Sequence, residues 1–219
     1  MIEAAIYDMD GLLVDSEPWW RVAEANVFGR LSKAPSEADF QLMMGRQIRE
    51  VIEHWYTIAP WKNYSLEETQ KEILSEVTRL VKENGKLLPG VEQSIAFFKN
   101  KNLKIALASS SPLFLINELM QHFGLFHRFE IICSAEFEKN GKPHPDVFLK
   151  AAATLNIQNE NCVVLEDSFN GLLAAKTAGM KCIVVPEKER FNQQRFVSAD
   201  LKLNSLEELS EENWKLING

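Results

Sequence analysis

The sequence predicts an α/β protein, in which helices cover both faces of a doubly wound parallel sheet and a helical segment is inserted after the first strand. Short apolar runs alternate with amphipathic helical patterns along most of the 219 residues, as is typical of parallel sheets. Residues 16–85 break this alternation, since they contain no convincing strand and hold four of the five tryptophans. We therefore expect an α/β domain of residues 1–15 and 86–219 and a helical domain of residues 16–85.

Five apolar runs are predicted strands, and a sixth is a candidate edge strand. In chain order they are residues 2–7, 104–108, 129–132, 163–165, 182–185 and, at the edge, 199–203. Pro112 and Pro145 are expected to open two of the helices between them. Ser205 begins a capping-box pattern that predicts the start of the last helix.

Local signals also place helices inside the insert. Ser16 is a predicted N-cap for a helix whose inward stripe includes Trp20 and Val27. Ser65 begins a second capping box, and Gly85 is expected to end that helix in the left-handed conformation. The crowded aromatic residues are expected to form the core of the insert itself.

The composition limits the function. The 24 basic and 31 acidic residues give a net charge of −7, which argues against binding to nucleic acids or acidic membranes. The first residues lack the basic start of a signal peptide, and no apolar run approaches the roughly 20 residues of a membrane span. The three cysteines are scattered without metal-ligand spacing. We expect a monomeric cytoplasmic protein.

Two acids, Asp8 and Asp10, follow the first predicted strand. Open parallel sheets bind ligands beyond the carboxyl ends of their strands, so this position is a candidate site. Two carboxylates this close need a cation, a shared proton or exposure to water. Taken alone, the pair is equally consistent with a solvated turn.

Polar residues also follow the other strands. Ser109 and Ser110 precede a helix, where they suit a phosphate but alone would merely cap the helix. Lys142 alone would be a surface lysine, and Glu166 and Asp167 alone would be helix caps. Together, acids, hydroxyls and a lysine at one edge of the sheet indicate a hard-cation site beside a phosphate-binding site.

These residues resemble the motifs of a known family, the haloacid dehalogenase-like hydrolases, and the insert is similar to the cap domain of its β-phosphoglucomutase-like branch. Within that branch the chain most resembles phosphatases of 2-deoxyglucose 6-phosphate or hexitol phosphates. The matching segments are Asp8–Gly11, Ser109, Lys142-Pro143 and Glu166-Asp167. The resemblance implies a Rossmann-like sheet with an inserted α-helical cap domain. It also implies a Mg²⁺-dependent phosphatase whose partner is a small phosphorylated metabolite, a sugar or polyol phosphate.

The resemblance also implies catalytic and metal-binding roles. Asp8 would be the nucleophile that forms an aspartyl-phosphate. Asp10 would protonate the leaving alkoxide and then deprotonate the attacking water. Mg²⁺ would be held by the Asp8 carboxylate, the Asp10 backbone carbonyl and Asp167, with Glu166 as an adjacent or water-mediated ligand.

Other matching residues would bind the phosphate. Ser109 and the Ser110 backbone would hold phosphoryl oxygens, and Lys142 would offset the negative charge there. Arg46 or Arg49 lies in a segment similar to the cap loop that contacts substrate, and either is a candidate to reach the phosphate or sugar. The alternative for both arginines is a solvated position on a helix.

Two other functions are less favoured. Mutases of this branch carry a cap histidine coupled to Asp10, whereas Trp20 stands at the matching position and cannot transfer a proton at neutral pH. We therefore favour transfer of the phosphoryl group to water over transfer to a second sugar. Phospho-aspartate signalling domains share the acids, hydroxyl, lysine and Mg²⁺, but they lack the insert and an acid in the place of Asp10.

Overall fold

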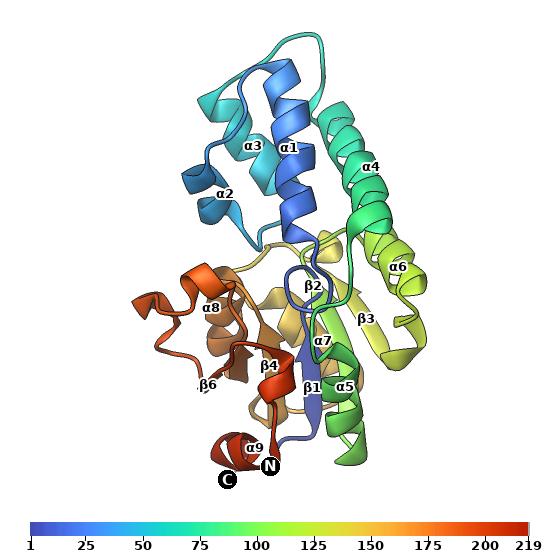
Figure 1. Ribbon diagram of the computed structural model, residues 1–219, viewed down its shortest axis with the longest axis vertical. Coiled ribbons are helices and arrows are strands. Elements are labelled where there is room, and N and C mark those ends of the chain that lie inside the picture. Colours follow the sequence, from blue (N-terminus) through green and yellow to red (C-terminus); the bar gives the residue numbers. More distant parts are fainter. Residues whose placement is uncertain (219) are drawn as a thin grey trace.

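The computed structural model describes residues 1–218, in which the sheet forms one part of an elongated molecule and four helices form the other (Figure 1). The strands are β1 (Ala4–Tyr7), β2 (Lys104–Ser109), β3 (Ile131–Ser134), β4 (Cys162–Glu166), β5 (Lys181–Val184) and β6 (Leu201–Lys202). The helices are α1 (Glu17–Leu31), α2 (Glu37–Met43), α3 (Ile48–Ile58), α4 (Leu66–Asn84), α5 (Val91–Asn100), α6 (Leu113–His122), α7 (Asp146–Leu155), α8 (Phe169–Thr177) and α9 (Glu211–Asn218).

The six strands form one parallel sheet in the order β3-β2-β1-β4-β5-β6. The order runs outward in both directions from β1, so the doubly wound parallel sheet predicted from the sequence is confirmed. Within residues 1–218, no helix combines the length and apolar character needed to cross a bilayer.

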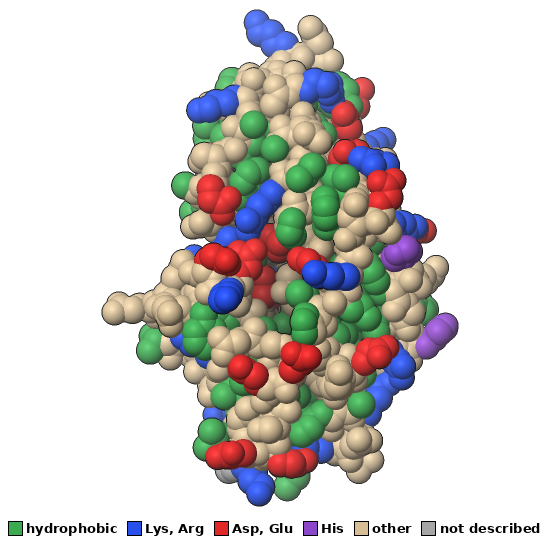
Figure 2. Space-filling view, viewed as in Figure 1, with side chains coloured by type: hydrophobic (Ala, Val, Ile, Leu, Met, Phe, Trp, Pro, Cys, Tyr) green, Lys and Arg blue, Asp and Glu red, His purple; other side chains and the backbone are tan. Residues whose placement is uncertain are grey.

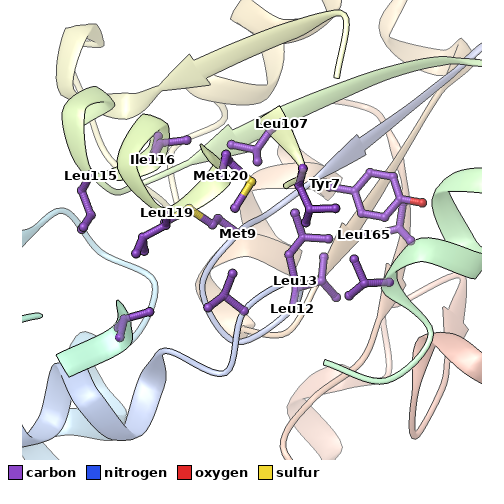
Figure 3. Close-up of a cluster of buried hydrophobic side chains, with 14 of the residues drawn as sticks. Tyr7, Met9, Leu12, Leu13, Leu107, Leu115, Ile116, Leu119, Met120 and Leu165 are labelled. Carbon is purple, nitrogen blue, oxygen red and sulfur yellow. The ribbon is translucent and has the colours of Figure 1, made fainter. Parts of the chain in front are cut away.

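Side chains alternate between the two faces of the sheet, as the period of a β-strand requires. In β1, Ala5 and Tyr7 join the cluster that includes residues of α5, α6 and α9, whereas Ala4 and Ile6 join the cluster that includes residues of α7 and α8. Part of the first cluster, around Tyr7 and Met9, is drawn in Figure 3. Both faces are therefore buried, which explains why the strands are almost entirely apolar.

Helices α1–α4 form the insert and lie beyond one end of the strands (Figure 1). Phe28 of α1 packs against Trp55 of α3 and against Trp61, with ring centroids 6.1 and 5.9 Å apart. Both tryptophans are buried, so they belong to the core of the insert, as expected. The division into two domains at residues 15/16 and 85/86 stays a prediction.

Several local expectations are corrected. β3 begins two residues later than predicted, at Ile131. Gly85 ends α4 with φ −70° and ψ 161°, an extended rather than left-handed conformation. Ser205 caps a short 3-10 helix, Leu206–Glu208, and the last helix begins only at Glu211. The signals at Gly85 and Ser205 thus correctly predicted a boundary between elements, but the backbone conformation predicted at each boundary was wrong.

Candidate active site

The register of the sheet brings three of the predicted residues to one edge. Tyr7, the last residue of β1, pairs with Leu107 of β2 and Leu165 of β4. Asp8 therefore leaves β1 close to the ends of both neighbouring strands, where Ser109 and Glu166 stand. Parallel strands end at the same edge of a sheet, which is why residues so distant in the chain meet here.

Lys142 is buried at the centre of this edge. Its Nζ donates to Asp8 Oδ1 at 2.5 Å and to Glu166 Oε1 at 2.6 Å, and its exposed fraction is 1%. Burial acts to lower the pKa of this ammonium, but the carboxylates of Asp8 and Glu166 outweigh it and raise that pKa above its ordinary value. Lys142 therefore stays charged, and the alternative of a solvated surface lysine is excluded.

Three carboxylates form a candidate metal centre beside Lys142. Asp8, Glu166 and Asp167 are buried, and each offers an oxygen within 4.8 Å of the others. Burial raises the pKa of Asp8 and of Asp167 well above the ordinary value, and neighbouring carboxylates add to this effect while Lys142 opposes it. A divalent cation would offset this clustered negative charge, and oxygen ligands suit a hard cation.

The two acids after β4 differ in how their oxygens are used. Glu166 Oε1 accepts from Lys142, and Oε2 accepts from the backbone N–H groups of Asp167 and Ser168 and from the Ser168 hydroxyl. Asp167 Oδ2 is buried and has no hydrogen-bond partner within residues 1–218. Gly11 lies against it, because a Cβ at Gly11 would be 2.3 Å from this oxygen. An orphaned buried oxygen of this kind fits a metal ligand, whereas Glu166 chiefly orients Lys142.

Four donors hold the Asp10 carboxylate. Its Oδ1 accepts from the Ser16 hydroxyl at 2.7 Å and from Trp20 Nε1 at 3.0 Å. Its Oδ2 accepts from the Ser111 hydroxyl at 2.7 Å and from the Ser109 hydroxyl at 3.4 Å. The side chain of Asp10 therefore points to the start of α1 and to the end of β2, whereas that of Asp8 points to Lys142.

The sequence did not predict that Ser16, Trp20 and Ser111 donate hydrogen bonds to the Asp10 carboxylate. Ser16 is the N-cap of α1 as predicted, but its side chain makes no capping hydrogen bond and instead serves Asp10. Trp20 cannot move a proton, but its indole N–H still couples α1 to Asp10. The four-residue spacing of Ser16 and Trp20 was a usable signal, since it puts both on one face of the helix.

Residues of the insert close over the site. The Ser110 hydroxyl donates to the Gly45 carbonyl at 2.7 Å, and Asn170 Nδ2 donates to the Met44 carbonyl at 2.8 Å. Arg46 lines the resulting cavity, and its Nη1 lies 3.4 Å from Glu50. Arg49 is exposed and pairs with Glu53 instead, so of these two predicted candidates Arg46 lines the cavity and Arg49 does not.

The cavity between insert and sheet contains both acids of the first motif and the serines after β2. Its volume is about 70 Å³, room for about two water molecules. Pockets for small-molecule ligands are usually larger than ~300 Å³. The cavity in this arrangement is therefore smaller than a pocket that holds a whole sugar phosphate usually is.

Comparisons with known proteins agree with this geometry. Residues 5–185 match the family model described as haloacid dehalogenase-like hydrolase. The chain is 43% identical over 210 residues to hexitol phosphatase B of Escherichia coli (strain K12), with 95% of each chain covered. It is 36% identical over 182 residues to a phosphorylated carbohydrates phosphatase of Thermotoga maritima, covering 83% of this chain and 84% of that one. The crystal structure of CbbY from Rhodobacter sphaeroides with phosphate superposes with a TM-score of 0.88 at 27% identity, covering 98% and 100% of the two chains.

Proposed function

Because this chain belongs to the haloacid dehalogenase-like hydrolases and is a phosphoric monoester hydrolase, we propose that it hydrolyses sugar or polyol monophosphates through an aspartyl-phosphate on Asp8. The substrate class follows that of the two phosphatase relatives, which act on hexitol phosphates and phosphorylated carbohydrates. The expected partner is a small phosphorylated metabolite, and the expectations of a monomer and of a cytoplasmic location are retained as part of the proposal.

The observation that carries the proposal is the different environment of two acids in one cavity. Asp8 is buried against the ammonium of Lys142, whereas Asp10 accepts hydrogen bonds from three hydroxyls and an indole N–H. Two acids with separate partners suit separate tasks, one as nucleophile and the other as general acid and base.

The chemistry follows from these positions. An oxygen of Asp8 attacks phosphorus and forms the acyl phosphate, while Asp10 gives its proton to the departing alkoxide. Asp10 then takes a proton from water as the water oxygen attacks phosphorus, which releases inorganic phosphate and restores the Asp8 carboxylate. Lys142 offsets charge on Asp8 and the phosphoryl group, and Ser109 with the Ser110 backbone binds phosphoryl oxygens.

Mg²⁺ is the proposed cofactor, held by Asp8, the backbone carbonyl of Asp10 and Asp167, with Glu166 adjacent. The orphaned Asp167 Oδ2 and the clustered buried carboxylates support this ligand set. When bound, the ion would reduce the repulsion between a carboxylate nucleophile and an anionic phosphate.

The test separates hydrolysis from mutase activity. The protein is incubated with Mg²⁺ and sorbitol 6-phosphate, and in parallel with β-glucose 1-phosphate plus a trace of glucose 1,6-bisphosphate. We expect inorganic phosphate as the main product without any need for the bisphosphate. Rapid formation of glucose 6-phosphate with negligible phosphate release would show that the protein is a mutase and not a hydrolase.

A further inference from the structure

One face of α1 forms a wall of the active-site cavity. Glu17, Trp20, Arg21 and Glu24 all line it, and their spacing of three and four residues puts them on one side of the helix. Trp20 hydrogen-bonds Asp10. Glu24 lies one helical turn further from Asp10 along α1, and no step of the proposed reaction uses it.

Glu24 is a buried polar group without a partner. Its exposed fraction is 9%, and within residues 1–218 its carboxyl makes no hydrogen bond. Phe40, Met43 and Val51 line the same cavity, so its surroundings there are largely apolar. Burial, partly offset by Arg21, raises the pKa of Glu24 to about 8. At neutral pH the carboxyl therefore keeps its proton and can both donate and accept a hydrogen bond.

Two arginines add unpaired donors to this wall. Arg21 Nη2 lies 3.0 Å from Glu187 and Nη1 lies 3.6 Å from Glu37, and Arg46 is paired with Glu50. The Nε of both arginines is buried and has no hydrogen-bond partner in the described part of the chain. Each guanidinium thus has a carboxylate partner, and the buried Nε–H groups remain available to a ligand as hydrogen-bond donors. Acidic and basic side chains gather near the middle of the molecule, where the insert meets the rest of the chain (Figure 2).

Hydroxyl groups match these unpaired atoms, because each hydroxyl donates one hydrogen bond and accepts others. We propose that Glu24 binds hydroxyls on the part of the substrate remote from its phosphate, so that the enzyme selects phosphate esters of hydroxyl-rich and otherwise uncharged chains. This inference rests on the proposed phosphatase function and names a residue that recognises the hydroxyl groups of the substrate.

A second phosphate on the substrate fits this wall poorly. It would lie near Glu187, and it would find both arginines already paired with carboxylates. Like charges in a site of this kind oppose binding. A bisphosphate, including one formed as a mutase intermediate, is therefore disfavoured relative to a polyol monophosphate.

The test compares two esters with chains of equal length, sorbitol 6-phosphate and hexyl phosphate, in the presence of Mg²⁺. We expect the wild-type protein to prefer the hydroxylated ester in kcat/KM by about tenfold or more. Glu24→Leu should lower that preference about tenfold, whereas Glu24→Gln, which keeps a donor and an acceptor, should retain most of it. Glu53→Leu, a matched change on the exposed side of α3, should leave the preference unchanged. Circular dichroism checks that each variant is folded.

Distinct outcomes overturn the two proposals. Wild-type protein that hydrolyses hexyl phosphate but shows no preference for the hexitol ester would refute the role of Glu24 and leave the phosphatase intact. A preference that survives in folded Glu24→Leu, or that is lost equally in Glu24→Gln, would also refute it. No phosphate release from either ester would overturn the phosphatase and this inference together.

Discussion

The two walls of the active-site cavity differ in how their buried polar groups are paired: on the sheet the described groups have partners apart from Asp167 Oδ2, whereas the insert leaves several unpaired. At the sheet, Lys142 bonds both Asp8 and Glu166, and Glu166 uses both oxygens. On the insert, Glu24 and the Nε atoms of Arg21 and Arg46 have no partner within residues 1–218. Buried polar groups are normally paired, so unpaired ones call for an explanation. We infer that the sheet provides a preformed site for the phosphoryl group. The polar groups on the insert wall would find their partners in the rest of the substrate.

The largest expected effect on the sheet wall is that of the substitution Asp8→Asn. Loss of the nucleophile should reduce phosphate release by at least about 10⁴-fold and abolish the phosphoenzyme, which is measured by trapping labelled phosphate on the protein. Asp10→Asn is the comparison, and it should slow both formation and breakdown of the phosphoenzyme by about 10²–10⁴-fold. Labelled phosphate trapped on Asp8→Asn would show that another residue is the nucleophile.

Removal of the metal should have a similarly large effect. With EDTA, activity should fall to background because the carboxylates around Asp8 would repel an anionic ester, and Mg²⁺ should restore it. Phosphate release is followed before and after the addition of a Mg²⁺ excess. Full turnover in chelator would mean that Lys142 alone offsets the charge.

A smaller effect tests the link between the two walls. Trp20→Phe removes the N–H that Asp10 Oδ1 accepts but keeps an aromatic ring. A hydrogen bond of roughly 1 kcal/mol corresponds to about a fivefold loss of kcat for sorbitol 6-phosphate. Trp19→Phe, next in the chain, is the matched control. An equal loss in both variants would point to packing of α1 rather than to the contact with Asp10.

The subtlest test concerns Glu24 and stability. The pKa of Glu24 is about 8 in the folded protein against 4.5 for an ordinary glutamate. Between these values the folded chain retains a proton that the unfolded chain loses, so this group lowers stability as pH rises from about 4.5 to 8. Gln cannot ionise, and the Tm of Glu24→Gln should therefore rise relative to wild type across this range, reflecting on the order of a few kcal/mol.

Thermal unfolding at pH 5, 6.5 and 8.5 provides the measurement, with Glu53→Gln as an exposed control. A constant difference in Tm between Glu24→Gln and wild type would show that Glu24 ionises in the folded protein as it does in the unfolded chain.

The sequence predicted the sheet wall much better than the insert wall. Asp8, Ser109 and Glu166 could be placed because apolar runs identify strands and parallel strands bring their ends together. Glu24 could not, because its burial depends on α2 and α3 folding back over α1. The stripe that includes Trp20 and Val27 correctly predicted a helix. The prediction assumed, however, that the inner face of this helix is purely apolar, whereas Glu24 also lies on it.

Local signals had a similar limit. Ser16 had the composition of an N-cap, yet the nearby Asp10 carboxylate took its hydroxyl. The pattern Ser205–Glu208 satisfied a capping box, yet the chain formed a 3-10 turn there before α9. At Ser16 a competing contact decided the outcome, and only the folded arrangement reveals that contact.

The contacts that close the cavity have a consequence for how such enzymes diverge. Ser110 and Asn170 donate to the main-chain oxygens of Gly45 and Met44, so these two closing contacts use no side-chain atom of the insert. Gly45 itself is constrained, because its φ is +79° and a Cβ would lie 2.7 Å from the Ser168 hydroxyl. Mutation can therefore change the residues that line the cavity on either side of Gly45 while the same closing contacts persist. At these two contacts, closure uses main-chain atoms of the insert while side chains line the cavity, so the lining can change while these contacts are inherited.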